Sequence, residues 1–328
     1  CVDVNAYDDV RTCCQGFSIC PKCWVFVSTA VHMLDAVLRS DLGLEDVLLT
    51  YSGCHGLHVW VSDAAARALD PTKRISMLQY IETLAGDDFR RTIGSTAAAL
   101  TAPLHPTLAR VYDVLESAFE RSIIPETGQR LLAERKHWTR IQDALPAVPD
   151  LRTSVSVCWW VGVRQLLRTS RYATPPRPLL HHVQEAWERA PDAATRWQQL
   201  RKAIGDALEQ AAKLPPKTRA ALQSFIPAVV FTYTYPRVAM PAAPSLSFWV
   251  RTPFSVHPDT RRVRVPLVPA TVDGLNPDEL LPTVATLASS IGAAVLAPFI
   301  EIFDRFVDGC VRHRAGAVAR LEVPPPRA

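Results

Sequence analysis

Four cysteines within eleven residues constrain the fold of this chain more than any other sequence feature. They have the spacing Cys-Cys-x5-Cys-x2-Cys and are Cys13, Cys14, Cys20 and Cys23. A Cys-x2-Cys knuckle commonly supplies half of a tetrahedral zinc shell, and four thiolates can complete one. The alternative is a group of buried thiols without metal. We expect these four residues to hold a structural zinc ion.

The rest of the composition is that of a folded protein from a reducing compartment. The chain has 328 residues, 48% of them hydrophobic, and a formal net charge of +4, which is compatible with a polyanionic partner. Cys1, Cys54, Cys158 and Cys310 are scattered and indicate no disulfide framework. We find no secretory signal and no apolar run long enough to span a bilayer. The first Met is Met33, so we expect a preceding segment to be missing or removed.

Secondary-structure signals change twice along the chain. Near the N-terminus a strand ending at residues 2–4, a helix from Pro21 to a stop at Gly43, and strands at 46–52 and 57–62 are predicted. Helical patterns follow, at residues 64–69, 73–85, 107–122, 128–144, 191–214 and 217–226. Strands at 246–250 and 262–265 and helices at 277–291 and 297–312 complete the chain.

This order indicates an α/β (α+β) core with an inserted all-helical subdomain. Residues 1–71 and 235–328 would form one discontinuous core that carries the cysteine motif 13–23. Residues 72–234 would form the helical subdomain. The Pro-rich segment 148–182 fits the helical pattern least and is predicted to be a further insertion.

Four sequence blocks in a fixed order resemble one protein family, the catalytic small subunit of eukaryotic and archaeal DNA primases. The blocks are Tyr7-Asp8-Asp9-Val10-Arg11-x-Cys13-Cys14, Ile19-Cys20-Pro21-Lys22-Cys23-Trp24, Tyr51-Ser52-Gly53-x-x-Gly56-x-His58-x-Trp60-Val61 and Pro253-Phe254-Ser255-Val256-His257-Pro258. Leu296-Ala297-Pro298-Phe299 is also similar. The resemblance covers nearly the whole chain.

The resemblance implies a primase-type catalytic core, a structural zinc ion and nuclear localisation. The implied activity is synthesis of short RNA primers on single-stranded DNA from ribonucleoside triphosphates. The implied partners are a primase large subunit and DNA polymerase α. Primer synthesis is a nucleotidyl transfer that uses two divalent cations, Mg²⁺ or Mn²⁺, held by carboxylates.

The family supplies those carboxylates as an Asp-x-Asp pair on one strand and a third Asp on a later strand. In this sequence Asp3 matches the second acid of the pair, whereas Cys1 and Ala239 stand at the other two positions. One carboxylate is a poor scaffold for two cations. The alternative hypothesis is therefore a catalytically impaired, primase-like binding or scaffold subunit. A third possibility is that an acid from elsewhere, such as Asp273, completes the site.

The resemblance also implies a set of nucleotide-binding residues. Ser52, His58 and His257 match residues that contact the triphosphate, and Arg251 stands where the family has a lysine. Two arginines that the family places after Ser-Gly are replaced here, by Cys54 and His55. Phosphate binding by this turn would then lose two charge-assisted hydrogen bonds.

Simpler roles remain open for most of these residues. Taken alone, Asp3 would more often cap a helix or lie at the surface, and His58 and His257 would more often be packed histidines. Asp8 and Asp9 are adjacent, so we interpret them as structural partners of Arg11 or of a helix start. The arginine run, Arg261, Arg262 and Arg264, is more typical of a solvated face than of contact with template phosphates.

Overall fold

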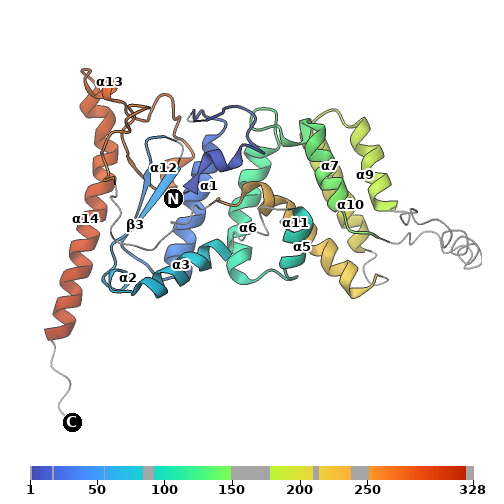
Figure 1. The fold of residues 1–328 in the computed structure, drawn as a ribbon, viewed down its shortest axis with the longest axis horizontal. Helices are drawn as coiled ribbons and strands as arrows, with labels where there is room; N and C mark the ends of the chain where they lie inside the picture. Colours follow the sequence, from blue (N-terminus) through green and yellow to red (C-terminus); the bar gives the residue numbers. More distant parts are fainter. Residues whose placement is uncertain are drawn as a thin grey trace, which may run out of the picture.

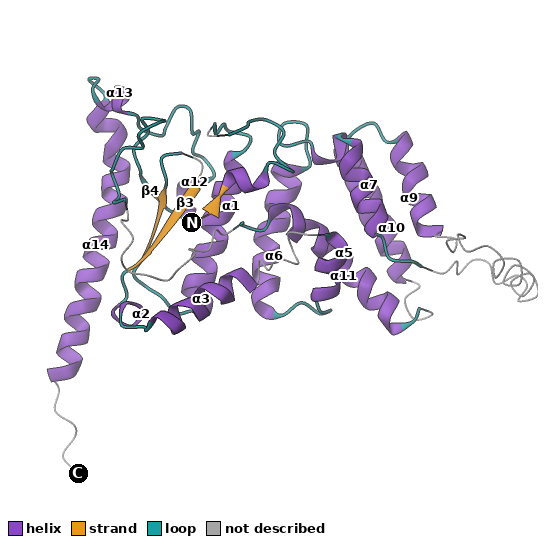
Figure 2. Ribbon diagram, viewed as in Figure 1, coloured by secondary structure: helices purple, strands orange, loops and turns teal. Residues whose placement is uncertain are grey.

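The structure is a computed structural model, and it describes residues 2–16, 18–54, 56–83, 92–148, 178–209, 214–237 and 251–322. A small sheet lies between the long helix α14 (Gly292–Glu322) and helix α1 (Trp24–Ala36), and helices extend from α1 to the opposite end of the molecule (Figure 1). The mixed, helix-rich architecture with a small antiparallel sheet agrees with the predicted fold class (Figure 2).

The sheet has four antiparallel strands in the order β1-β3-β2-β4. The predicted hairpin is confirmed: β2 is Val47–Tyr51 and β3 is Gly56–Val61, paired from Val47 opposite Val61 to Tyr51 opposite Leu57. The outer strands are short, with β1 at Val2–Asp3 and β4 at Pro266–Leu267. All five residues of β2 are buried because α14 packs against this part of the sheet.

Helix α1 joins the sheet to the helical part of the molecule. It packs against β3 and against α6 (Pro106–Ala118). The prediction that it begins at Pro21 is wrong by three residues. The Cys20 carbonyl accepts hydrogen bonds from the N–H groups of Cys23 and Trp24, so residues 21–23 form a turn instead. A π-helical turn at Val37–Asp41 follows, and the predicted stop at Gly43 is confirmed by its φ of +63°.

The remaining helices form most of the molecule. α7, α9 and α10 lie at the end farthest from α14 (Figure 1). In chain order the helical elements are α2 (Ala64–Arg67), α3 (Pro71–Thr83), α5 (Ile93–Ala99), α6, a π-helical turn (Phe119–Ile123), a 3₁₀ turn (Leu131–Ala133), α7 (Arg135–Ala144), α9 (Pro178–Arg189), α10 (Ala193–Glu209), α11 (Pro216–Thr234), α12 (Pro269–Val272), α13 (Val284–Leu287) and α14.

Besides α1, three predicted helices differ markedly from the structure. The helix expected at 128–144 begins only at 135, because Gly128 approaches the Ser122 carbonyl closely and Arg130 has a left-handed φ of 56°. The helix expected at 277–291 is reduced to α13. Helix α11, expected to end at 226, continues through Pro227 to Thr234. Its last seven residues are all buried, and this burial offsets the lost backbone hydrogen bond.

Several predictions fall on residues that the structure does not describe. These are the strand at 246–250, Cys1, His55, Cys158, Ala239 and most of the segment 148–182, whose last five residues belong to α9. The two-part domain division therefore stays a prediction. Within the described residues no helix is long and apolar enough to cross a membrane.

Candidate functional site

The four cysteines of the N-terminal motif converge in one cluster. All four Sγ atoms lie within 4.8 Å of one another. The Sγ atoms of Cys20 and Cys23 are 3.8 Å apart, and the Cys20 N–H donates to Cys23 Sγ at 3.1 Å. Tetrahedral coordination with Zn–S bonds of about 2.3 Å requires sulfur atoms about 3.8 Å apart. The number, type and spacing of these donors therefore fit a four-coordinate metal ion.

A residue from a distant segment fixes this cluster in place. The side chain of Gln129 is fully buried, and its Nε2 donates to Cys13 Sγ at 3.3 Å and to the Lys22 carbonyl at 2.8 Å. The Thr12 N–H donates in turn to Gln129 Oε1 at 2.8 Å. Gln129 thus holds both ends of the cysteine loop. Sequence spacing gave no signal for this contact, because 116 residues separate Gln129 from Cys13.

The thiols influence one another's proton affinity. A hydrogen bond from Cys23 lowers the pKa of Cys13 to about 5, and the same bond raises the pKa of Cys23. Burial, followed by hydrogen bonding to Cys20, raises the pKa of Cys14 to about 11. One thiolate is therefore stabilised by neighbouring thiols that remain protonated. A bound cation would take over this role, since thiolates are the metal-binding form.

Asp3 ends the short strand β1 and begins the 3₁₀ helix Val4–Tyr7. Its Oδ1 accepts a hydrogen bond from the Asn5 N–H at 2.8 Å, which is the capping role that the sequence left open. In the sheet, Asp3 lies opposite Gly56 at the start of β3. The carboxylate is therefore held rigidly beside the turn that connects β2 with β3.

That turn is organised by Ser52. Its Oγ accepts hydrogen bonds from the N–H groups of Cys54 at 3.3 Å and Gly56 at 2.9 Å, and its own N–H donates to the Gly56 carbonyl. Gly53 has a φ of +80°, a backbone conformation that favours glycine. The turn is consequently tight and preorganised, with Ser52 at its base.

A second loop packs directly on the turn. A methyl group at Gly53 would lie 3.0 Å from His257 Cβ and 3.1 Å from the Arg262 carbonyl oxygen. The Thr260 hydroxyl donates to the Gly53 carbonyl at 2.5 Å. Backbone hydrogen bonds join Phe254 with Arg264 and His257 with Arg262, so the loop is a closed hairpin. The structure thus brings His257 to the turn of Ser52, although 205 residues separate them in the sequence.

The charge at this place is strongly positive. His58 is half-buried on β3, and burial, followed by nearby positive charges that include Arg264 and Arg251, lowers its pKa to about 4. Arg251 is exposed. All five residues predicted to bind metal or nucleotide, Asp3, Ser52, His58, Arg251 and His257, thus belong to segments that meet around the turn of residues 52–56. A group of cationic side chains with one carboxylate suits a polyphosphate ligand.

The other acidic residues that the sequence analysis considered lie away from the Ser52 turn and interact with basic side chains. Asp8 accepts from the Arg11 guanidinium at 2.9 Å, which confirms its structural role. Burial by itself would raise the pKa of Asp9, but the hydrogen bond and charge of Arg237, and those of Arg140, outweigh it and lower this pKa. Neither acid is a candidate to complete the Asp3 site.

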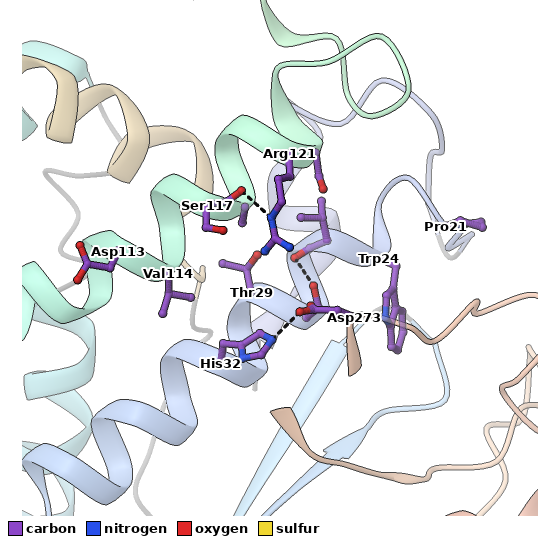
Figure 3. Close-up of a pocket in the computed structure, with 13 residues that line it drawn as sticks. Pro21, Trp24, Thr29, His32, Asp113, Val114, Ser117, Arg121 and Asp273 are labelled. Carbon is purple, nitrogen blue, oxygen red and sulfur yellow. Dashed lines mark hydrogen bonds and ion pairs between the residues drawn. The ribbon is translucent and has the colours of Figure 1, made fainter. Parts of the chain in front are cut away.

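Asp273 lies in a separate cavity of about 460 Å³ between α1 and α6. Its carboxylate is 3.0 Å from His32 Nε2, and Figure 3 shows Arg121 also pointing toward it. The described lining of this cavity includes Trp24 of α1 but no residue of β1 or of the 52–56 turn. The hypothesis that Asp273 supplies a missing catalytic acid therefore gains no support.

The arginine run corrects one expectation from the sequence. Arg261 is exposed, and the Arg262 guanidinium lies 3.4 Å from the Asp278 carboxylate. Arg264, in contrast, is only 3% exposed. The predicted solvated face therefore does not include Arg264. Val263 and Val265, on either side of Arg264, are both buried in the core. Because successive side chains of an extended segment point to opposite faces, this Val-x-Val pattern could have indicated that Arg264 lies on the other face.

Comparison with known proteins gives a consistent result. A model of the DNA primase small subunit family matches residues 2–269. The chain is 30% identical over 294 residues to the DNA primase small subunit of Schizosaccharomyces pombe, covering 88% of this chain and 56% of that protein. It is 28% identical over 322 residues to the protein of the same name in Saccharomyces cerevisiae, covering 97% and 70%. The corresponding Drosophila melanogaster protein is 26% identical over 296 residues, covering 89% and 59%.

Proposed function

The chain belongs to the DNA primase small subunit family, and from this premise we propose that it carries out template-directed nucleotidyl transfer to make short RNA primers. The chain spans little more than half the length of the S. pombe relative. We therefore propose its reaction, its substrates and its partners from its family membership. The proposed substrates are ribonucleoside triphosphates and a single-stranded DNA template.

One observation carries the proposal. The sheet places Asp3 opposite Gly56, at the turn whose other side packs against His257. Three segments that are distant in sequence meet at this turn, and between them they carry a carboxylate, a hydroxyl and two histidines. This is the combination that a nucleoside triphosphate with its metal ions requires.

In the proposed reaction the primer 3′-hydroxyl oxygen attacks the α-phosphorus of the incoming nucleotide, and pyrophosphate leaves. Bound Mg²⁺ or Mn²⁺ would activate the hydroxyl and neutralise the leaving group. Asp3 would hold such a cation, with substrate phosphates supplying further oxygen ligands. Ser52 and His58 would position the triphosphate from the β2–β3 side. His257 and Arg251 would do so from the opposite loop. Because Asp3 is a single carboxylate, we expect weak binding of the catalytic cations.

The cysteine cluster is proposed to be a structural zinc site outside the reaction. Four thiolate donors favour Zn²⁺ over hard cations, and a closed four-ligand shell leaves no position for substrate. The ion would fix the loop that precedes α1, the helix on which the sheet packs. Residues 72–234 are proposed to form an inserted helical subdomain.

The proposed assembly follows from family membership. A primase small subunit is expected to bind a primase large subunit and, through it or beside it, DNA polymerase α. Nuclear localisation is proposed on the same ground, because the S. pombe, S. cerevisiae and D. melanogaster relatives are eukaryotic DNA primase small subunits.

The decisive experiment measures template-dependent dinucleotide synthesis with Mg²⁺ and with Mn²⁺. The wild-type protein, with its large subunit, is expected to make product that Asp3→Ala abolishes. Asp143→Ala, which removes a carboxylate from helix α7, is the matched control and should leave synthesis unchanged. Binding of nucleotide and template without synthesis would instead establish the impaired, scaffold-type subunit. The names of the relatives do not favour that alternative.

A further inference from the structure

Arg264 is a buried arginine beside the turn of residues 52–56, although the sequence suggested only a solvated face for it. A methyl group at Gly53 would lie 3.6 Å from Arg264 Cγ, so the side chain runs along the turn. The residues on either side, Val263 and Val265, are buried in the hydrophobic core. Since side chains alternate along an extended segment, Arg264 faces away from that core and toward Gly53 of the turn.

The Arg264 guanidinium lacks a matching anion in the described part of the chain. Its Nε has no hydrogen-bond partner, and no described carboxylate lies within ion-pair distance of it. Burial, together with the positive charge of the neighbouring Arg251, lowers the pKa of Arg264. Burial also raises the pKa of the nearby Cys54 thiol, which keeps that group neutral. A buried, unpaired cation is unfavourable unless an anion joins it.

The turn itself provides no permanent positive charge. Residues 52–56 are Ser-Gly-Cys-His-Gly, and two of the N–H groups in the turn are occupied by Ser52 Oγ. A phosphate seated at the turn must therefore find its cation on the opposing loop. Arg264 is the buried cation of that loop that touches the turn. A guanidinium offers several N–H donors in one plane, a geometry that suits two phosphate oxygens at once.

We propose that Arg264 binds a phosphate group of the incoming nucleotide at the turn of residues 52–56. This inference rests on the proposed function, because it assigns a further contact to the same substrate. In this arrangement Arg251 is the exposed cation and Arg264 the buried cation beside the turn. The phosphate chain would then lie between the Ser52 turn and the His257 loop.

The test measures binding of ATP and of inorganic triphosphate to the full chain by calorimetry, with Mg²⁺ and without template. Four proteins are compared: wild type, R264Q, R264K and R189Q. Arg189 is an exposed arginine at the end of α9 and serves as the matched control. R264Q should weaken the binding of both ligands about ten- to hundredfold, the range for one charge-assisted contact. R264K should weaken both by less, and R189Q should match wild type.

The outcomes separate this inference from the proposed function. If wild type binds neither ligand, the proposed function fails. If wild type binds and R264Q binds equally well, Arg264 is not a phosphate ligand, although the proposed function survives. A loss confined to ATP would assign Arg264 to the base or sugar and overturn the inference. Circular dichroism checks that each variant is folded. If R264Q does not fold, R264K decides, and unchanged triphosphate affinity in R264K overturns the inference.

Discussion

The Tyr7 hydroxyl donates a 2.6 Å hydrogen bond to the carbonyl oxygen of Tyr235, and so joins the segment after Asp3 to the end of helix α11. The Arg237 N–H donates to the same hydroxyl at 3.1 Å, and the Arg237 guanidinium lies 4.6 Å from the centre of the Tyr7 ring. The Tyr7 side chain is fully buried. Through these contacts the helical part of the molecule fixes where Asp3 lies.

Tyr7→Phe should therefore destabilise the protein more than an average conservative substitution. It removes two hydrogen bonds and leaves the Tyr235 carbonyl and the Arg237 N–H without this partner, which costs about 1–3 kcal/mol. Urea unfolding at pH 7 measures this change. Tyr80→Phe is a milder comparison, since the Tyr80 hydroxyl is only partly buried. Equal stability of Tyr7→Phe and wild type would show that the bond does not hold the two segments together.

Gln129→Ala should weaken metal retention by the cysteine cluster. Its side chain donates to Cys13, one of the four proposed zinc ligands, and to the loop at Lys22. Loss of such an outer contact typically reduces metal affinity by about 10- to 100-fold. The measurement is zinc content by mass spectrometry after dialysis against graded chelator. Gln198→Ala, at an exposed site on α10, is the control. A metal-free wild-type protein after purification with zinc would refute the zinc site itself.

Gly53→Ala and Gly205→Ala should change stability in opposite directions. At Gly53 the φ is +80° and the new methyl would press on His257 and on the Arg262 carbonyl, so we expect a loss of about 1–3 kcal/mol. At Gly205, inside α10, a methyl meets no atom within 4 Å, so we expect a gain of about 0.5–1 kcal/mol. Denaturant unfolding of both variants tests this. Gly53→Ala should also weaken ATP binding, because it displaces the His257 loop.

His137 should make the protein less stable in mild acid. The side chain is 2% exposed, and burial lowers its pKa from 6.5 to about 4. The folded state therefore resists protonation more than the unfolded chain does. The stability that His137 contributes is fully present above pH 6.5 and falls as the pH drops toward 4. Between pH 8 and pH 5 the loss is about 2 kcal/mol.

The variant His137→Phe isolates this effect. Phenylalanine keeps a ring against Tyr233, the aromatic neighbour of His137, and cannot be protonated. Unfolding free energies measured from pH 8 to pH 5 should fall less steeply for the variant than for wild type. Parallel curves would show that His137 is not a source of the acid sensitivity. The pKa of His58 is also lowered to about 4, so His58 should contribute equally to the pH dependence of the unfolding free energy in wild type and in His137→Phe.

Local patterns in the sequence predicted the central hairpin, the helix that follows the cysteines and the stop at Gly43. Each depends on residues close together in the chain: alternation for β2 and β3, a 3.6-residue period for α1, and a left-handed glycine. Local patterns failed at residues 128–144 and at Pro227. There the outcome depends on contacts that no local pattern contains, a close approach to Ser122 in one case and burial of the end of α11 in the other.

The sequence by itself determined the family, the cysteine cluster and the candidate residues of the site, because these are matters of residue type and spacing. Only the tertiary structure decided that Gln129 closes the cysteine loop, that Asp3 also caps a 3₁₀ helix, and that Arg264 is buried beside Gly53. The physical reason is that burial and long-range hydrogen bonds depend on how all segments pack together. Arg264 looks solvated in the sequence, but in the folded chain it is buried beside the turn, and its Nε has no hydrogen-bond partner among the described residues.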